Sequence, residues 1–119
     1  MQQEQFRNWM EAYIRAWSSN DPQEIGELFT AEAFYYTAPY REPWEGRQQI
    51  VQGWLERKDD PEDFEFRYEI LGSSENTGFV RGWTTYHGPP RSYSNLWVIR
   101  LDETGQCEEF IEWWMQEEE

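Results

Sequence analysis

The hydrophobic pattern changes its period near residue 64, and this change limits the folds available to the chain. From Phe6 to Trp17, apolar side chains recur with the i, i+3, i+4, i+7 spacing of an amphipathic helix. From Phe64 to Ile70, they alternate with Glu and Arg, which is typical of a half-buried strand. This order of elements, with helices before strands, predicts an α+β domain with helices on one face of a curved antiparallel sheet.

Turn residues divide this pattern into three helices, one early strand and a four-strand meander. Asp21 is placed to cap a short second helix that buries apolar residues as far as Phe29, with Pro22 at its first position and Glu24 completing a capping box. Gly46 precedes a third helix, which ends before Pro61. Strands are expected over residues 33–38, 64–70, 79–87, 93–101 and 107–115.

Aromatic residues are unusually frequent in an otherwise polar chain. Eight Trp, seven Tyr and seven Phe occur among 119 residues. Large rings with polar tips suit the walls of a concave cavity better than a small compact core, because a buried indole N–H or phenol O–H needs a partner. The composition therefore predicts a pocket but does not identify the molecule that it binds.

The charge balance excludes several classes of partner. Ten basic residues face 24 carboxylates, which gives a net charge of −14. Such a chain repels phosphate backbones and anionic lipids, so we expect no nucleic-acid and no membrane partner. The sequence contains no apolar run of spanning length and no visible signal peptide. The single cysteine, Cys107, is expected to be a buried apolar filler, and a reducing cytoplasmic location fits best.

The sequence gives no indication of a cofactor or a metal. His87 is the only histidine and has no cysteine or histidine partner, so a zinc site is not expected. A rim or surface position is the simpler interpretation of this residue. No glycine-rich phosphate loop is present either.

Five short motifs, taken in order, resemble the nuclear transport factor 2-like superfamily and, within it, the SnoaL-like and ketosteroid-isomerase branch. They are Tyr13-Ile14, Asp21–Ile25, Ala38-Pro39, Gly46–Ile50 and Val98–Gly105. The resemblance implies a single domain over residues 1–119, ending in an acidic tail at 116–119. It also implies a cone, in which a bent sheet wraps around a long first helix and leaves an apolar pocket at its open end.

The resemblance suggests which side chains face the pocket. On the early strand these would be Tyr36 and Ala38, and on the last strand Phe110, Glu112 and Trp114, although alternation alone leaves the last strand ambiguous. The expected ligand-binding residues are Trp17, Tyr36, Trp54, Tyr86, Tyr93, Asn95, Trp97, Phe110 and Trp114.

Ketosteroid isomerases use a tyrosine, a protonated aspartate and a basic aspartate before a proline. Carried over by motif, the tyrosine corresponds to Tyr13, but the base position holds Ala38 and the acid position holds Trp97. Because two of the three groups are missing, the resemblance does not extend to isomerase activity of the usual type.

Glu112 is then the strongest catalytic candidate, with Tyr13 beside it. A carboxylate between Phe110 and Trp114 on an inward face would be desolvated, and its pKa would rise toward neutrality, as a general acid or base requires. Two other interpretations remain open. Glu112 pairs structurally inside the cone, or it faces outward through a one-residue change of register.

The outer face of the sheet is expected to carry both charges and apolar residues. Arg67, Arg81 and Arg100 would lie among Glu side chains, with Trp83 and Trp113 between them. Exposed tryptophans indicate a partner, and the family resemblance implies a homodimer through this face.

Three functions follow from these expectations. The first is an enzyme of isomerase, cyclase, dehydratase or hydrolase type, which acts on a small apolar, ring-containing metabolite with Glu112 as acid or base. The second is a non-catalytic binder or carrier of such a molecule. The third is a ligand-free dimerisation module, in which Trp17, Trp54, Trp97 and Trp114 would pack against one another.

Overall fold

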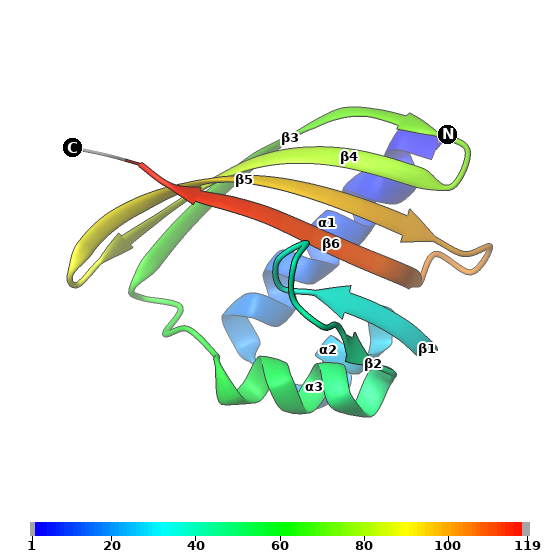
Figure 1. The fold of residues 1–119 in the computed structure, drawn as a ribbon, viewed down its shortest axis with the longest axis horizontal. Coiled ribbons are helices and arrows are strands. Elements are labelled where there is room, and N and C mark those ends of the chain that lie inside the picture. Colours follow the sequence, from blue (N-terminus) through cyan, green and yellow to red (C-terminus); the bar gives the residue numbers. More distant parts are fainter. Residues whose placement is uncertain (1, 118–119) are drawn as a thin grey trace.

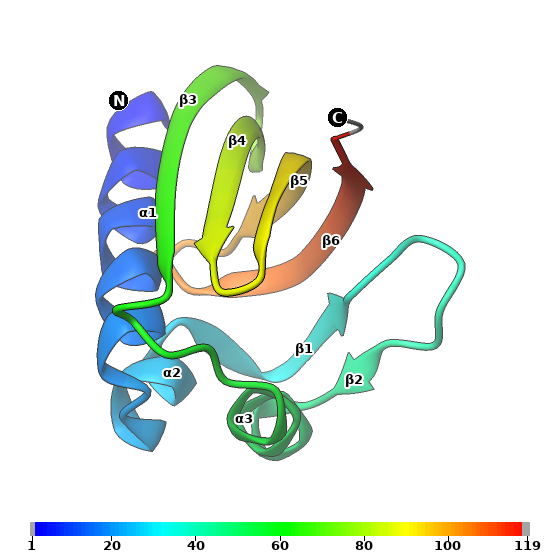
Figure 2. The same cartoon turned by 90° about the vertical axis from the view of Figure 1, so that its left-hand side faces the viewer.

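The fold is a curved sheet wrapped around one long helix, as seen in a computed structural model that describes residues 2–117 (Figures 1 and 2). The helices are α1 (Gln2–Ser19), α2 (Pro22–Glu27) and α3 (Arg47–Glu56). The strands are β1 (Phe29–Tyr36), β2 (Trp44–Glu45), β3 (Phe64–Ser74), β4 (Thr77–His87), β5 (Pro90–Leu101) and β6 (Cys107–Gln116). The architecture is the expected α+β cone of three helices, one early strand and a four-strand meander, with the two-residue strand β2 in addition.

The sheet has the order β2-β1-β6-β5-β4-β3. All neighbours are antiparallel except β1 and β6, which run parallel. Register shifts interrupt β3 between Ile70 and Gly72, and β5 between Arg100 and Leu101. Such irregularities increase local twist and bend, which suits a sheet that curls around α1. Figure 2 shows α1 beside the concave side of β3–β6, with β1, β2 and α3 at one end.

The apolar face of α1 packs into this concave side. Phe6, Met10 and Ala16 are at most 1% exposed. Gly78 on β4 permits the close approach, because a Cβ atom there would collide with the ring of Phe6. The helix ends at Asn20, whose φ of 54° is left-handed and whose N–H donates to the Ala16 carbonyl at 2.7 Å. None of the described helices combines the length and apolar character needed to cross a membrane.

The start of α2 follows the predicted cap, with one difference. The Asp21 carboxylate accepts the Gln23 N–H at 2.9 Å, and Pro22 occupies the first turn. The Asp21 N–H does not bond directly to Glu24. Ser19 lies between them, accepting from the Asp21 N–H at 3.1 Å and donating its hydroxyl to Glu24. The helix also ends earlier than expected, so that Phe29 begins β1.

The strands extend beyond the predicted bounds because propensity does not mark where backbone pairing stops. β1 begins at Phe29 rather than Ala33, and its parallel pairing with β6 starts at Phe29 and Cys107. β3 and β4 continue to the Ser74–Thr77 pair, which leaves a shorter turn than the sequence suggested. Of the expected acidic tail, Gln116 ends β6 and the Glu117 N–H donates to the Ser92 carbonyl at 2.8 Å. Residues 118 and 119 lie outside the described part.

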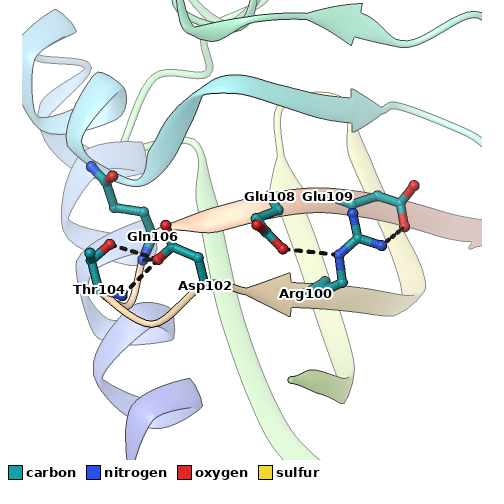
Figure 3. A network of polar contacts seen from close by, with 6 residues as sticks. All are labelled: Arg100, Asp102, Thr104, Gln106, Glu108 and Glu109. Carbon is teal, nitrogen blue, oxygen red and sulfur yellow. Dashed lines mark hydrogen bonds and ion pairs between the residues drawn. The ribbon is translucent and has the colours of Figure 1, made fainter. Parts of the chain in front are cut away.

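The turn between β5 and β6 is built around Asp102 (Figure 3). Its Oδ1 accepts from the Thr104 hydroxyl at 2.6 Å, the Thr104 N–H at 2.9 Å and the Gln106 N–H at 3.1 Å. The Thr104 hydroxyl, followed by the backbone donors, lowers the pKa of Asp102. Beside the turn, Arg100 pairs with Glu108 at 3.2 Å and Glu109 at 3.4 Å on the outer face (Figure 3).

Candidate functional site

Cross-strand neighbours on the inner face of β4, β5 and β6 form successive rows that become more exposed along the strands. The row of Gly78, Ile99 and Phe110 is fully buried. In the next row, Val80 and Trp97 are buried and Glu112 is partly exposed. In the third, Gly82 and Asn95 are buried, whereas Trp114 is 43% exposed. The cone is therefore packed solid at one end and opens at the other.

A cavity of about 340 Å³ occupies the open end. Its walls come from α1, β1, β2, α3, the segment after α3 and the inner faces of β4, β5 and β6. The lining residues are Tyr13, Trp17, Tyr35, Thr37, Arg41, Trp44, Trp54, Arg57, Lys58, Asp59, Thr84, Tyr86, Arg91, Tyr93, Asn95, Trp97, Glu112 and Trp114. Tyr13, Tyr35 and Trp97 are at most 6% exposed and form its floor.

Glu112 lies beside this floor at the end of a chain of hydrogen bonds. Its Oε2 accepts from Asn95 Nδ2 at 2.8 Å, and Asn95 Oδ1 accepts from the Thr84 hydroxyl at 2.9 Å. Because the Asn95 oxygen is already bonded to Thr84, its amide nitrogen is the atom directed at the carboxylate. Thr84 and Asn95 thus fix the position of Glu112.

Burial raises the pKa of the Glu112 carboxyl to about 7, while nearby donors on Trp97 and Asn95 act in the opposite direction. Trp97 is the cross-strand neighbour of Glu112. Among the described residues, no acceptor forms a hydrogen bond of full geometry with its buried indole N–H. The N–H nevertheless lies close enough to Glu112 to favour the ionised form of that carboxyl group. The carboxyl is therefore poised to gain or lose a proton near neutral pH.

Two tyrosines of the floor, Tyr13 and Tyr35, lie close to Glu112. The hydroxyls of Tyr13 and Tyr35 lie 2.9 Å apart, and burial raises the pKa of both phenols. The pair shares one hydrogen bond, so one of its two O–H protons has no partner within the pair. The floor of the cavity thus combines a titratable carboxyl with phenol protons that stay in place at neutral pH.

A second carboxylate, Asp59, stands at the rim. Its Oδ2 accepts from the Trp17 indole N–H and from the Tyr86 hydroxyl, both at 3.1 Å. Its backbone carbonyl accepts from Asn20 Nδ2 at 3.2 Å, and Asn20 Oδ1 accepts from the Trp54 N–H at 3.3 Å. These bonds connect the end of α1, the segment after α3 and the end of β4. They connect the aromatic walls to one another at the rim of the cavity.

The structure brings most of the sequence-predicted site residues together. Both catalytic candidates, Glu112 and Tyr13, line the cavity. So do seven of the expected ligand-binding residues: Trp17, Trp54, Tyr86, Tyr93, Asn95, Trp97 and Trp114. The ambiguous parity of the last strand is resolved, because Glu112 faces inward and Trp113 faces outward.

Two of the predicted ligand-binding residues do not line the cavity. Tyr36 is on the outer face of β1, and its neighbour Tyr35 occupies the inner position instead. The register that the resemblance implied for this strand was wrong by one residue, and Tyr35 pairs across the sheet with inward-facing Phe110. Phe110 itself is fully buried beneath the floor, with its ring 4.5 Å from that of Tyr35 and 5.7 Å from that of Tyr13.

Several lining residues were missed because they lie on loops or on the unexpected strand β2. Trp44 reaches the wall from β2 and stacks on Tyr35 at 4.9 Å. Gly53 on α3 makes room for it, since a Cβ atom there would collide with the Trp44 ring. The remaining lining residues that the sequence did not indicate are Thr37, Arg41, Arg57, Lys58, Asp59 and Arg91. Periodicity carries no signal for the loop positions, and Arg91 lies on β5 two residues before the predicted start of that strand.

His87 and Cys107 lie outside the cavity. His87 is exposed at the end of β4, with its Nε2 3.3 Å from a Glu65 oxygen. Cys107 is fully buried, which confirms its interpretation as a core filler, and burial raises the pKa of its thiol.

A cone-shaped sheet around a long helix, with a cavity at its open end, defines the class to which this molecule belongs. The SnoaL-like domain model matches residues 10–110. The chain is therefore a member of the SnoaL-like family of the nuclear transport factor 2-like superfamily. No curated protein matches it.

Solved structures share the same fold at low sequence identity. A nuclear transport factor 2-like protein of unknown function from Burkholderia xenovorans superposes with a TM-score of 0.78 at 19% identity, covering 100% of this chain and 89% of that one. A protein provisionally assigned as a ketosteroid isomerase from Kribbella flavida gives 0.74 at 14% identity, covering 98% and 82%. An uncharacterised protein with a cystatin-like fold from Silicibacter pomeroyi gives 0.67 at 17%, covering 90% and 73%. At these identities the likeness is one of fold alone.

Proposed function

We propose that the cavity binds a small, ring-containing apolar molecule and that Glu112 exchanges a proton with it. The observation that carries this proposal is the position of Glu112 beside the floor of an aromatic cavity, held by Asn95, with burial raising its pKa to about 7. Five of the eight tryptophans line the same cavity and offer faces on which rings can stack.

The chemistry this arrangement favours is cofactor-independent acid–base catalysis. Glu112 acts as the acid in its protonated form and as the base once it is ionised. The Tyr13 and Tyr35 pair supplies an O–H donor for an oxygen of the bound molecule on which negative charge develops. An isomerase, cyclase, dehydratase or hydrolase would use these two functions. Ala38 and Trp97 stand where ketosteroid isomerases carry carboxylates, so their usual residue set is not the model for this site.

The experiment starts with a ligand search and then isolates Glu112. Tryptophan fluorescence is used to screen aromatic and steroid-like compounds, and the compounds that bind are tested for conversion. For a converted compound, Glu112→Gln should reduce turnover at least about a hundredfold while binding survives. Glu108→Gln, on the outer side of the same strand, is the matched control and should leave turnover unchanged. Equal turnover in wild type and Glu112→Gln would remove Glu112 from the mechanism.

A non-catalytic binder is the second candidate, and one observation favours it. The Asn95–Glu112 hydrogen bond and the Thr84–Asn95 bond behind it would serve equally well as a fixed polar anchor for a carried molecule. This function predicts tight binding with no conversion of any compound found. The third candidate, a ligand-free dimerisation module, is less well supported. It would pack four tryptophans against one another, but these residues line a cavity: Trp17, Trp54, Trp97 and Trp114.

We propose further that two copies of the chain associate through the outer face of the sheet. A row of apolar side chains, Tyr36, Ile111, Val98 and Phe79, crosses β1, β6, β5 and β4. Beside it, Leu96 and Trp113 are cross-strand neighbours with 38% and 42% exposure. Charges of both signs border the patch, including Arg81 and Glu69, so the face is complementary to a second copy of itself.

Light scattering at micromolar concentration tests the dimer. The expected mass is twice the chain mass of 14.6 kDa, and Trp113→Glu should return it to the monomer value. Trp114→Glu, one residue further on but on the inner face, is the matched control and should stay dimeric. A wild-type mass near 14.6 kDa would overturn the proposal.

A further inference from the structure

Basic residues gather around the cavity of a strongly acidic protein. Arg41, Arg57, Lys58 and Arg91 line it, and they are four of the ten basic residues in a chain with 24 acidic ones. Among the described residues, only two carboxylates line the same cavity, those of Asp59 and Glu112. The sign of the local charge is thus opposite to that of the whole molecule.

These cations lie at the mouth rather than on the floor. Arg41, Arg57 and Lys58 are exposed, on the loop after β1 and at the end of α3, and Arg91 is half-buried at the start of β5. The deeper groups are the uncharged rings of Tyr13, Tyr35 and Trp97 and the single carboxyl of Glu112. The cavity therefore has a basic rim and an apolar interior.

Within the described residues, none of the four cations forms an ion pair with a carboxylate, whereas Arg81 and Arg100 on the outer face do. Two of the arginines lie instead over aromatic rings of the cavity wall. The Arg91 guanidinium is 4.2 Å from the centroid of Tyr86, and that of Arg57 is 5.9 Å from the centroid of Trp44. One N–H group of the Arg91 guanidinium donates to the Pro89 carbonyl at 3.0 Å. The rings thus hold two of the guanidinium groups close to the mouth.

We infer that the molecule bound in this cavity is an organic carboxylate, with its rings inside and its carboxylate held by the basic rim. This inference rests on the proposed function and specifies its ligand class. A guanidinium offers paired N–H donors that match a carboxylate, and such charge-assisted bonds are among the stronger ones in proteins. A basic rim also attracts anions to a mouth that the net charge of −14 would otherwise make repellent.

The geometry also sets the orientation of the bound acid. A ligand carboxylate placed at the floor would lose its hydration among groups that include no cation, namely Tyr13, Tyr35, Trp97 and Glu112. At the rim it meets Arg57, Lys58 and Arg91 instead. The end of the molecule that reaches Glu112 is therefore its uncharged part, where a proton can be moved.

Isothermal titration calorimetry with matched acids and amides tests the inference. The probes are 2-naphthoate and 2-naphthamide, and biphenyl-4-carboxylate with its primary amide, which differ in charge but hardly in shape. Each acid should bind at least about tenfold more tightly than its amide at low salt. The advantage should shrink as sodium chloride is added, because the rim is exposed to solvent.

Two triple variants with the same charge change locate the effect. Arg57→Gln/Lys58→Gln/Arg91→Gln should abolish the preference for the acids, with amide binding retained. Arg7→Gln/Arg15→Gln/Arg100→Gln, away from the cavity, should keep it. Equal affinity for acid and amide in wild type, or the same preference in both triple variants, would overturn the inference and leave the proposed function standing. Failure of every acid and amide to bind would overturn both.

Discussion

The two ends of the cone are built from the same elements but differ in what their side chains touch. At the closed end, Phe6 on α1 and Phe29, Ile99 and Phe110 on the sheet are at most 1% exposed and fill the space between helix and strands. At the open end, Trp114 on the strand that carries Phe110 is 43% exposed and lines a cavity of about 340 Å³. One helix and one sheet thus provide a core and a hollow side by side.

This difference shows which end of the fold contributes most to stability and which end can hold reactive groups. Close packing at the closed end contributes to the free energy of unfolding through apolar burial. The open end holds a carboxyl whose burial disfavours its charged form, and such a group costs stability at neutral pH. The division predicts that substitutions at the closed end lose the most stability, whereas those at the open end have smaller effects on stability and also change titration and binding.

The largest effect is expected at the closed end. Phe6→Ala should reduce the free energy of unfolding by about 3–5 kcal/mol, because it empties space around a fully buried ring. Urea denaturation followed by circular dichroism measures this loss. Trp114→Ala removes an aromatic ring of the open end and should cost at most about 1 kcal/mol, since that ring is partly exposed. Equal losses in the two variants would show that the closed and open ends do not differ in their contribution to stability.

A smaller effect, of opposite sign, is expected for Glu112→Gln. The pKa of Glu112 rises from 4.5 to about 7 on folding, so the folded state holds the proton more tightly than the unfolded state. Wild-type stability should therefore fall as pH rises from about 4.5 to 7, by at most about 3 kcal/mol. The glutamine variant lacks this cost and should be the more stable protein at pH 8.

Denaturation at two pH values checks this prediction. At pH 4 the two proteins should be equally stable, because the carboxyl is protonated in both the folded and the unfolded state. Tyr13, Tyr35, Tyr86 and Asp59 also surround the site, but both proteins contain them, so the difference isolates Glu112. A Glu112→Gln variant that is less stable than wild type at pH 8 would contradict the account of burial.

The smallest effect is expected at the rim. The Trp17 ring stacks on Phe64 with centroids 4.2 Å apart, and Trp17→Phe keeps an aromatic ring there but removes the indole N–H that donates to Asp59 at 3.1 Å. The free energy of unfolding should fall by about 1 kcal/mol, the usual net value of a hydrogen bond. Asp59→Asn, which retains an acceptor for Trp17 and Tyr86, is the control and should lose less. A loss as large as that of Phe6→Ala would mean that the rim contributes as much to the free energy of unfolding as the closed end does.

The sequence predicted those parts of the molecule that periodic patterns determine. The aromatic face from Phe6 to Trp17 marked α1, alternation marked β3, and turn residues separated the later strands. The family resemblance implied the inward positions of Asn95 and Trp97, and the polar residues Ser94 and Arg100 on the opposite face of β5 agree with it. The helix and strand assignments are local, since each depends only on the residues along one element and its turns.

Features that depend on pairing between distant segments were not predictable in this way. The one-residue error that chose Tyr36 instead of Tyr35 arose because the register of β1 is set by its parallel pairing with β6. The basic rim was missed because Arg41 and Lys58 lie on loops, where side-chain direction has no period. Glu112 and the direction of its pKa shift were predicted, but its inward position and its hydrogen bond from Asn95 required the folded structure.

Direct titration of the Glu112 carboxyl tests the central claim, which is that this group is desolvated beside the floor of the cavity. Its side-chain carbon can be followed by ¹³C NMR from pH 3 to pH 9, with Glu112→Gln identifying the resonance. The account predicts a midpoint near pH 7, well above the ordinary value of 4.5. A midpoint near 4.5 would show a solvated carboxylate and would contradict the proposed acid–base role.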